Sequence, residues 1–411
     1  MNKIKEKLLE RFLRYVRIDT QSDESRADKV HPSTSGQWDL LRMLEKELKD
    51  AGLTDVCLDE YGYLLARIPA NVESVPAVGF GAHVDTASDV KGNGVKPCVV
   101  ENWDGKDILL KAGNSIKVAE NPELADYRGK TLVVSDGSTL LGSDDKAGVS
   151  IIMSMVEFLT SNPDVKHGEI EILFSPDEET GHGMDFFDVK RLRSEAFYTV
   201  DGSSAHYIED ECFNAATFKV KFTGVPRHLG DARGVMVNAL TMCSHFVASL
   251  PQSQSPEATD GRYGYYCPYQ MSGGVSDAEL AVLVRDFDSE GLNRRIKVLE
   301  KLSDTVCSLY GGKSETEYKI SYKNMHMASK KDPRAVKYLL QAGELLGQNI
   351  KREIIRGGTD GARIAEYGIP CPNIYTGGHN LHSCLEWVSL DAMYESFELI
   401  TETVKKWAES V

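Results

Sequence analysis

Hydrophobic residues follow a helical and a strand period in alternation along residues 1–211. Residues 37–51 place four leucines on one helical face, and Gly52 follows as a helix-ending residue. Residues 75–82 form an apolar run typical of a strand buried on both faces. Residues 147–159 have the spacing of a helix packed on a sheet. This alternation predicts an α/β fold with helices flanking a sheet.

The pattern changes after Gly202. Residues 218–222 alternate apolar and charged side chains, which is the period of a half-buried antiparallel strand. The remaining elements of this region are predicted as helices at 235–250 and 292–309 and strands at 281–288 and 316–324. Their order predicts a small α+β domain with two helices on one face of its sheet.

The α/β pattern returns from about Lys331, with a helix predicted over 335–346 and a strand near 372–375. We therefore predict one helix-flanked, mixed-sheet domain built from residues 1–211 and 327–411. Residues 212–326 would be inserted into it as an α+β lid or dimerisation domain. Such an insertion is tolerated where its two ends lie in exposed loops.

Composition excludes several classes of partner. The formal net charge of −15 at pH 7 would repel a nucleic acid or an anionic membrane at long range. The eight cysteines include no C-x-x-C pair, as expected of reduced thiols in a cytosol. The N-terminus lacks the apolar core of a signal peptide, and no run is long enough to cross a membrane. We expect a cytoplasmic protein with no nucleic-acid or membrane partner.

The adjacent acids Glu178 and Glu179 are the first candidate chemical groups. They follow a strand predicted over residues 169–174, and α/β sheets usually build their sites at strand ends. Consecutive side chains of extended backbone diverge, so one carboxylate could bind a metal while its neighbour faces a metal-bound water. A solvated acidic turn is the alternative, and an isolated acidic pair favours it.

Further acids and imidazoles lie at other predicted element ends. His83 and Asp85 share one side of an extended segment, so Asp85 could orient His83 or a neighbouring group. Asp144 precedes a buried helix, where capping of free N–H groups is the alternative to metal binding. Asp201 ends another strand, and His382 follows a glycine turn, although a single histidine is more often structural than a ligand.

Several segments resemble, in order and with similar intervals, the zinc-dependent exopeptidase family that includes carboxypeptidase G, aminoacylase and peptidase T. The resemblance covers nearly the whole chain and is closest to the peptidase T branch, the tripeptide aminopeptidases. The main segments are FGAHVDT (80–86), TLLGSDDKAG (139–148), SPDEE (175–179), YTVDG (198–202) and RGGTDG (356–361). In the predicted lid, GVMVNA (234–239) and RDFD (285–288) add to it.

The resemblance implies that the larger domain is catalytic and holds two Zn²⁺ ions. The implied ligands are His83 and Asp201 on one ion, Glu179 and His382 on the other, and Asp144 bridging both. Two such ions bring four positive charges, which three carboxylates and one hydroxide would offset. Mn²⁺ or Co²⁺ could occupy the same mixed nitrogen and oxygen ligands.

The resemblance also implies roles for three further residues, and Arg356, which precedes a glycine-rich turn, is an additional candidate. Asp85 would stand behind the ligands, and Glu178 would be the general acid/base for the metal-activated water. His228 matches a lid histidine that in this family reaches a catalytic site, in dimeric relatives that of the partner subunit, and would support the oxyanion. Arg356 is the candidate for binding the substrate's carboxylate, with an intradomain salt bridge as the alternative.

Two stretches depart from the family pattern. Leu229 stands where the family usually has proline after the lid histidine. Ser383, Cys384 and Leu385 follow His382 where peptidase T commonly has basic residues. The loop geometry around His228 and the reach of the site toward substrate therefore depend on residues particular to this chain.

The leading hypothesis is a tripeptide aminopeptidase that acts on small peptides and releases their N-terminal residue. A dipeptidase or an aminoacylase of the same family is the alternative, because it would share all metal ligands. A non-catalytic relative of the fold is a third hypothesis, but it would have no chemical need for Glu178. A homodimer through an exposed strand of the lid is a further expectation.

Overall fold

The computed structural model describes residues 3–409 and divides into two compact units. The first comprises Met1–Asp210, His326–Glu353 and Thr359–Val411, and the second Glu211–Met325 and Ile354–Gly358. The short segment Ile354–Gly358 thus belongs to the second unit, although the sequence assigns it to the closing part of the larger domain. The domain boundaries expected from the sequence, at residues 211/212 and 326/327, stay a prediction.

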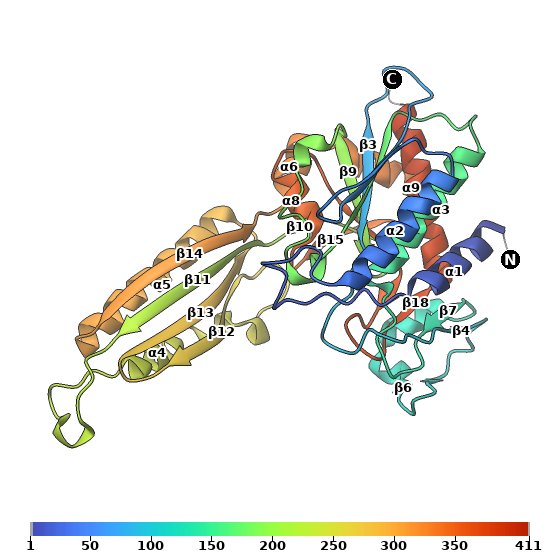
Figure 1. Cartoon of the computed structure of the whole chain (residues 1–411). Helices are drawn as coiled ribbons and strands as arrows, with labels where there is room; N and C mark the ends of the chain where they lie inside the picture. The colour runs from blue at the N-terminus through green and yellow to red at the C-terminus, as the bar shows by residue number, and fades with distance from the viewer. Residues whose placement is uncertain (1–2, 410–411) are drawn as a thin grey trace. The chain divides into compact units, whose positions relative to one another are not determined.

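An eight-stranded mixed sheet forms the centre of the first unit (Figure 1). Its middle strands β8, β3, β9 and β16 run parallel, whereas β2 pairs antiparallel with β8 and β10 with β16. In spatial order the strands are β1 (Asp55–Leu58), β2 (Leu64–Ile68), β8 (Ile170–Ser175), β3 (Val78–His83), β9 (Ala196–Gly202), β16 (Asn373–Tyr375), β10 (Tyr207–Cys212) and β15 (Lys351–Ile355). The predicted helix-flanked mixed sheet is confirmed.

Helices cover this sheet because alternate residues of its buried strands face opposite sides. α3 packs on β3 and β9, α9 packs on α3, and α8 contacts β9. In Figure 1, α3 and α9 lie on one side of β3 and β9, with α6 and α8 on the other. The helices are α1 (Lys3–Tyr15), α2 (Ser35–Asp50), α3 (Ser143–Ser161), α6 (His326–Lys331), α7 (Arg334–Leu345), α8 (Asp360–Ala365) and α9 (Leu390–Ala408).

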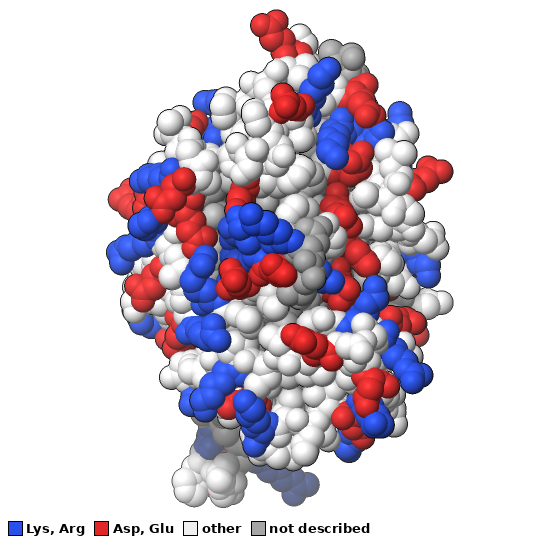
Figure 2. All heavy atoms as spheres, turned by 90° about the vertical axis from the view of Figure 1, so that its right-hand side faces the viewer, with Lys and Arg blue, Asp and Glu red and all other residues white. Residues whose placement is uncertain are grey.

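Basic and acidic side chains intermingle on the face that carries α1 (Figure 2). Ion pairs there join α1 to its neighbours, such as Arg14 to Glu47 at 2.6 Å and Lys5 to Asp391 at 2.6 Å. The net negative charge of the chain is therefore not concentrated on this face. Among residues 3–409, no helix combines the length and apolarity that crossing a membrane requires.

Two small sheets arise from the irregular stretch 95–135 and the end of the chain. β4 (Cys98–Val100) and β7 (Leu132–Val134) join β17 (Gly378–His379) and β18 (Trp387–Ser389) in one sheet. β5 (Ile108–Leu109) and β6 (Ser115–Ile116) form a hairpin of the kind expected for so long an excursion. The loop between β17 and β18 carries His382.

The second unit is an antiparallel sheet with helices on one face. Its strands, in spatial order, are β12 (Tyr265–Gly273), β13 (Asp277–Asp286), β11 (Asn214–Thr223) and β14 (Lys313–Tyr322). The helices are α4 (Ala239–Ala248) and α5 (Ser289–Tyr310). Side chains of α4 and α5 share an apolar core with alternate residues of β11 and β13, such as Phe218 and Val282. Helix α4 starts later than predicted because the Asn238 side chain accepts hydrogen bonds from Leu240 and Thr241.

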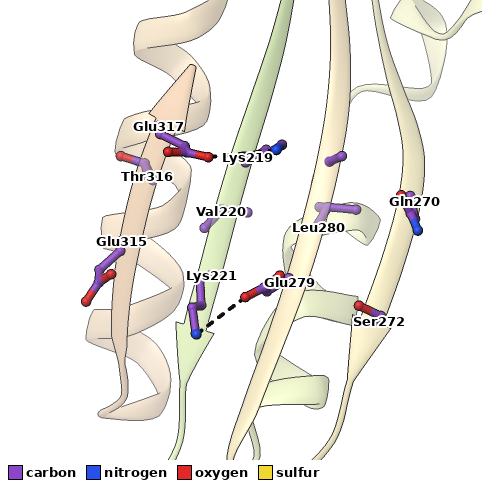
Figure 3. A pocket seen from close by; sticks show the side chains of 11 residues that line it. Lys219, Val220, Lys221, Gln270, Ser272, Glu279, Leu280, Glu315, Thr316 and Glu317 are labelled. Carbon is purple, nitrogen blue, oxygen red and sulfur yellow. Dashed lines mark ion pairs between the residues drawn. The ribbon is translucent and has the colours of Figure 1, made fainter. Parts of the chain in front are cut away.

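The other face of this sheet is open. Alternating charges line it, and Lys221 lies 3.4 Å from Glu279 on the neighbouring strand (Figure 3). Lys219 similarly lies 3.9 Å from Glu317 of β14. Cross-strand pairs of opposite charge favour this strand register, although each contributes little where water has access.

Candidate metal centre

The candidate ligands gather where the parallel strands β8, β3 and β9 end. His83 is the last residue of β3, and Asp201 is the last but one of β9. Glu178 and Glu179 lie in a short 3-10 helix (Glu178–Thr180) just after β8. The pair is therefore not in extended backbone, as the sequence suggested, because Asp177 before it adopts a left-handed conformation with a φ of 58° and turns the chain.

Two groups of potential ligands lie side by side at this edge of the sheet. Each group places its ligand atoms within 4.8 Å of one another. The first cluster, as we name it, is His83, Asp144 and Asp201; the second cluster is Asp144, Glu179 and His382. The fold thus brings together all five residues that the sequence resemblance implies as metal ligands.

Asp144 belongs to both clusters and presents a different oxygen to each. Its Oδ1 lies 2.9 Å from Nε2 of His83, and its Oδ2 lies 3.4 Å from Nε2 of His382. Asp201 Oδ1 is 3.4 Å from the same His83 nitrogen, and Glu179 Oε1 is 3.1 Å from the same His382 nitrogen. One carboxylate thus stands between two histidine–carboxylate pairs, which is the arrangement a bridging ligand requires.

Electrostatics at the clusters reflect crowded carboxylates. Burial, followed by the neighbouring charge of Asp144, raises the pKa of Glu179 to about 7. Burial likewise raises the pKa of Asp201 to about 7. Hydrogen bonds with Asp144 and Glu179 raise the pKa of His382 to about 11. The raised pKa values of these acids and of His382 show that the clustered carboxylates require positive charge beside them.

A carboxylate faces the outer nitrogen of each histidine. The buried Asp85 places Oδ1 3.2 Å from Nδ1 of His83, and it also accepts hydrogen bonds from the backbone N–H groups of Glu178 and Glu179. Asp89 places Oδ2 3.3 Å from Nδ1 of His382. Such outer carboxylates fix the orientation of an imidazole ligand. Asp89 was missed in the sequence because nothing in its spacing indicates that it meets a residue so distant along the chain.

Within the described part of the chain, Glu178 belongs to neither cluster of potential ligands. It lines a small cavity together with His83, Asp201 and Asp360. Burial raises the pKa of its carboxyl well above the ordinary value. Glu178 and Glu179, although adjacent in sequence, therefore occupy different environments.

Comparisons with known proteins place this geometry in a family. The model of "Peptidase family M20/M25/M40" matches residues 126–406. The chain belongs to this family. It is 42% identical to peptidase T of Bacillus licheniformis over 99% of this chain and 100% of that protein. It is 41% identical to peptidase T of Clostridium novyi over 98% of this chain and 100% of that protein.

Solved structures of the family share the fold. An aminopeptidase PepT from Bacillus cereus superposes with a TM-score of 0.78 at 22% identity, covering 98% of this chain and 99% of that one. A tripeptidase from Staphylococcus aureus gives 0.79 at 21% identity, covering 99% of each. A dinuclear metal-binding M20 peptidase from Bacillus subtilis gives 0.70 at 12% identity, covering the whole of both chains.

Arg356 lies in the second unit and not among the clusters. Its guanidinium donates to the backbone carbonyls of Thr259, Gly261 and Tyr263 and to the Thr259 hydroxyl. It also stacks over the ring of Phe213. These oxygens engage four of the N–H donors of Arg356, and its role toward a substrate carboxylate stays a prediction. Its contacts attach Ile354–Gly358 to the second unit.

His228 also lies in the second unit. Its side chain is 84% exposed and accepts a hydrogen bond from the backbone N–H of Gly230. Leu229, the residue at the proline position of the family motif, is exposed as well. The family role of His228 stays a prediction.

Proposed function

We propose that this chain is a metallo-aminopeptidase that releases the N-terminal residue of tripeptides. The relatives named peptidase T support the hydrolase class, since each matches this chain from end to end at more than 40% identity. The single observation that carries the proposal is Asp144, which presents one oxygen to each of two histidine–carboxylate pairs. A mononuclear site would need no carboxylate shared in this way.

The residues fit a pair of divalent cations. Oε1 of Glu179 is buried and faces Nε2 of His382 at 3.1 Å, so an imidazole that uses this nitrogen to bind a metal would leave the oxygen without a donor. A buried carboxylate oxygen without a donor costs free energy unless a cation or a proton meets it. His83 and Asp201 would hold one ion, Glu179 and His382 the other, and Asp144 both. The named dinuclear relative from Bacillus subtilis supports two ions per site.

Divalent ions bound at such a pair lower the pKa of water and polarise a peptide carbonyl. The chain supplies the proton transfer. Glu178 has a raised pKa and lines the cavity beside His83, so its carboxylate can accept a proton from the attacking water and return it to the leaving amine. Asp85 holds the backbone of both glutamates, which fixes this carboxylate relative to the ligands.

Zinc is the metal we propose, because two histidines and three carboxylates form the mixed donor set that Zn²⁺ accepts. Mn²⁺ and Co²⁺ accept similar donors. Elemental analysis of protein purified without added metal would decide between them. We expect two equivalents of zinc per chain, and one equivalent or none would contradict the dinuclear site.

Substrate class is tested with a panel of peptides of matched sequence. We expect hydrolysis of a free-amine tripeptide, and much slower hydrolysis of the same tripeptide after N-acetylation. A preference for the dipeptide would favour a dipeptidase, and cleavage of N-acetyl amino acids an aminoacylase. A protein that binds two metals and cleaves none of these compounds would leave only a non-catalytic role.

Oxyanion stabilisation by His228 and self-association through the second unit belong to the same proposal. The exposed imidazole of His228 is available for a contact that arises on closure or assembly. Sedimentation of the wild type, together with the kcat of His228→Ala, tests both. A monomer with unchanged kcat in the variant would remove His228 from the mechanism.

A further inference from the structure

Glu386 is a buried carboxylate outside both clusters. It lies four residues after His382 and is only 1% exposed. The buried cation nearest in sequence to the Asp144 loop, Lys146, donates its hydrogen bond to the carbonyl of Ile18 and not to this acid. The buried carboxylate of Glu386 must therefore be stabilised by other hydrogen-bond donors.

Those partners are consecutive groups of a single loop. Oε2 accepts from the backbone N–H groups of Leu141 at 2.7 Å and Gly142 at 2.9 Å. Oε1 accepts from the backbone N–H of Ser143 at 2.6 Å and from its hydroxyl at 2.6 Å. The backbone N–H of Asp144 points to the same oxygen at 3.4 Å. Charged hydrogen bonds of this kind are short and strong.

The loop that Glu386 binds, residues 141–144, carries the shared ligand Asp144. It begins α3, yet the N-cap residue Gly142 has no side chain with which to cap, and it adopts a left-handed φ of 81°. Asp144 itself has non-helical backbone angles. The remote carboxylate of Glu386 thus replaces the local N-cap, and it holds the loop in the conformation that points Asp144 toward both histidines.

The backbone of Glu386, in contrast to its side chain, belongs to the turn that carries His382. His382 has a left-handed φ of 59°, and Asn380 before it a φ of 52°. The Ser383 hydroxyl donates to the carbonyl of Asn380, and the backbone N–H of Glu386 donates to the carbonyl of Ser383. This tight turn is rigid only if its ends are fixed, and the carboxylate of Glu386 fixes one of them.

We propose that Glu386 is a positioning residue that sets the separation between Asp144 and His382 and so determines the affinity of the second cluster for its metal. The inference rests on the dinuclear function proposed above. Without this carboxylate, the Asp144 loop and the His382 turn would lose their common anchor. Outer groups that orient metal ligands typically account for about 10- to 100-fold in metal affinity.

The test variant is Glu386→Gln, whose amide NH₂ would face backbone N–H groups that now meet an oxygen. The matched control is Glu171→Gln. Glu171 is equally buried and lies at the opposite end of β8 from the clusters. It accepts from the backbone N–H groups of Arg193 and Ser194 and from the Ser194 hydroxyl, and in addition it pairs with Arg67 at 2.8 Å. The control thus distinguishes the general effect of removing a buried, hydrogen-bonded carboxylate from the specific effect of removing the one that binds the Asp144 loop.

The measurement is titration of Zn²⁺ into the full chain after chelation, with Co²⁺ absorption as a second readout of ligand geometry. His382→Ala identifies the equivalent that belongs to the second cluster. We expect Glu386→Gln to raise the Kd of that equivalent by about 10- to 100-fold and to shift the Co²⁺ spectrum, while Glu171→Gln leaves both within about twofold of wild type.

Wild-type affinity in Glu386→Gln, or an equal loss in Glu171→Gln, would overturn the proposal. If Glu386→Gln does not fold, Ser143→Ala decides, since it removes one donor and is expected to raise the same Kd by a few-fold, to about tenfold at most. Unchanged affinity in Ser143→Ala would then count against the clamp. A wild-type chain that binds no second equivalent would instead refute the dinuclear function itself.

Discussion

The two clusters share one aspartate but differ in how the protein encloses them. His83 is 2% exposed, and its outer nitrogen meets the fully buried Asp85. His382 is 40% exposed, and the Asp89 carboxylate beside it is 63% exposed. The first cluster is thus held by the end of a buried strand, whereas the second is completed by a surface turn. A dinuclear site can in this way combine one firmly held ion with one that substrate and solvent can reach.

Loss of Glu178 is expected to have the largest effect and to leave both clusters intact. Glu178→Gln removes the proton acceptor but neither ligand set, so kcat should fall by about 10²–10⁴-fold with two metal equivalents retained. Steady-state kinetics and elemental analysis of the same preparation measure the two quantities. A near-wild-type rate would remove Glu178 from the mechanism, and lost metal would mean that it is a ligand.

The two clusters should lose their metal ions at different rates. A chelator is expected to take the ion of the exposed second cluster first and that of the buried first cluster later. Removal of each ion should lower the free energy of unfolding by about 3–4 kcal/mol at metal concentrations some 100- to 1,000-fold above its Kd. Metal content against time, with thermal unfolding of each fraction, measures this. Simultaneous loss of both ions would contradict the difference between the clusters.

The two outer carboxylates offer a matched pair of substitutions. Asp85→Asn should raise the Kd of the first cluster by about 10- to 100-fold, because a buried acceptor orients its histidine. Asp89→Asn should change the Kd of the second cluster by less than about threefold, because water competes for an exposed carboxylate. Competition titrations with a chromophoric chelator compare them. Equal effects would show that exposure does not distinguish the clusters.

A partly buried acid outside the clusters should affect stability and not metal binding. Glu209 accepts a hydrogen bond from Asn373, and burial raises the pKa of its carboxyl to about 7. A raised folded-state pKa contributes stability below the unfolded pKa that is lost as pH rises through the folded value.

Glu209→Gln should therefore be more stable than wild type by roughly 1–3 kcal/mol at pH 8, and the difference should nearly vanish near pH 4.5. Chemical denaturation at both pH values tests the sign. An identical difference at both would mean that ionisation of Glu209 does not matter.

Much of the site was readable from sequence because its residues sit at ends of periodic elements. His83, Asp144 and Asp201 each adjoin an apolar run whose period predicts a strand or helix, and those elements formed nearly where expected. Strand β12 was not predicted, because its exposed and irregular side chains carry no clear period. The contacts of Arg356 and Asp89 also escaped, since each depends on a partner distant in sequence.

The sequence by itself determined the chemical types of the ligands, the order of helices and strands, and the family, because these depend on local periodicity and on motifs. Tertiary structure decided which groups meet. It gave one oxygen of Asp144 to each histidine and placed Glu179, but not Glu178, in a ligand cluster. It also committed Arg356 to the second unit and joined Glu386 to a loop 243 residues away. Such pairings arise only when the chain closes on itself, so no local pattern contains them.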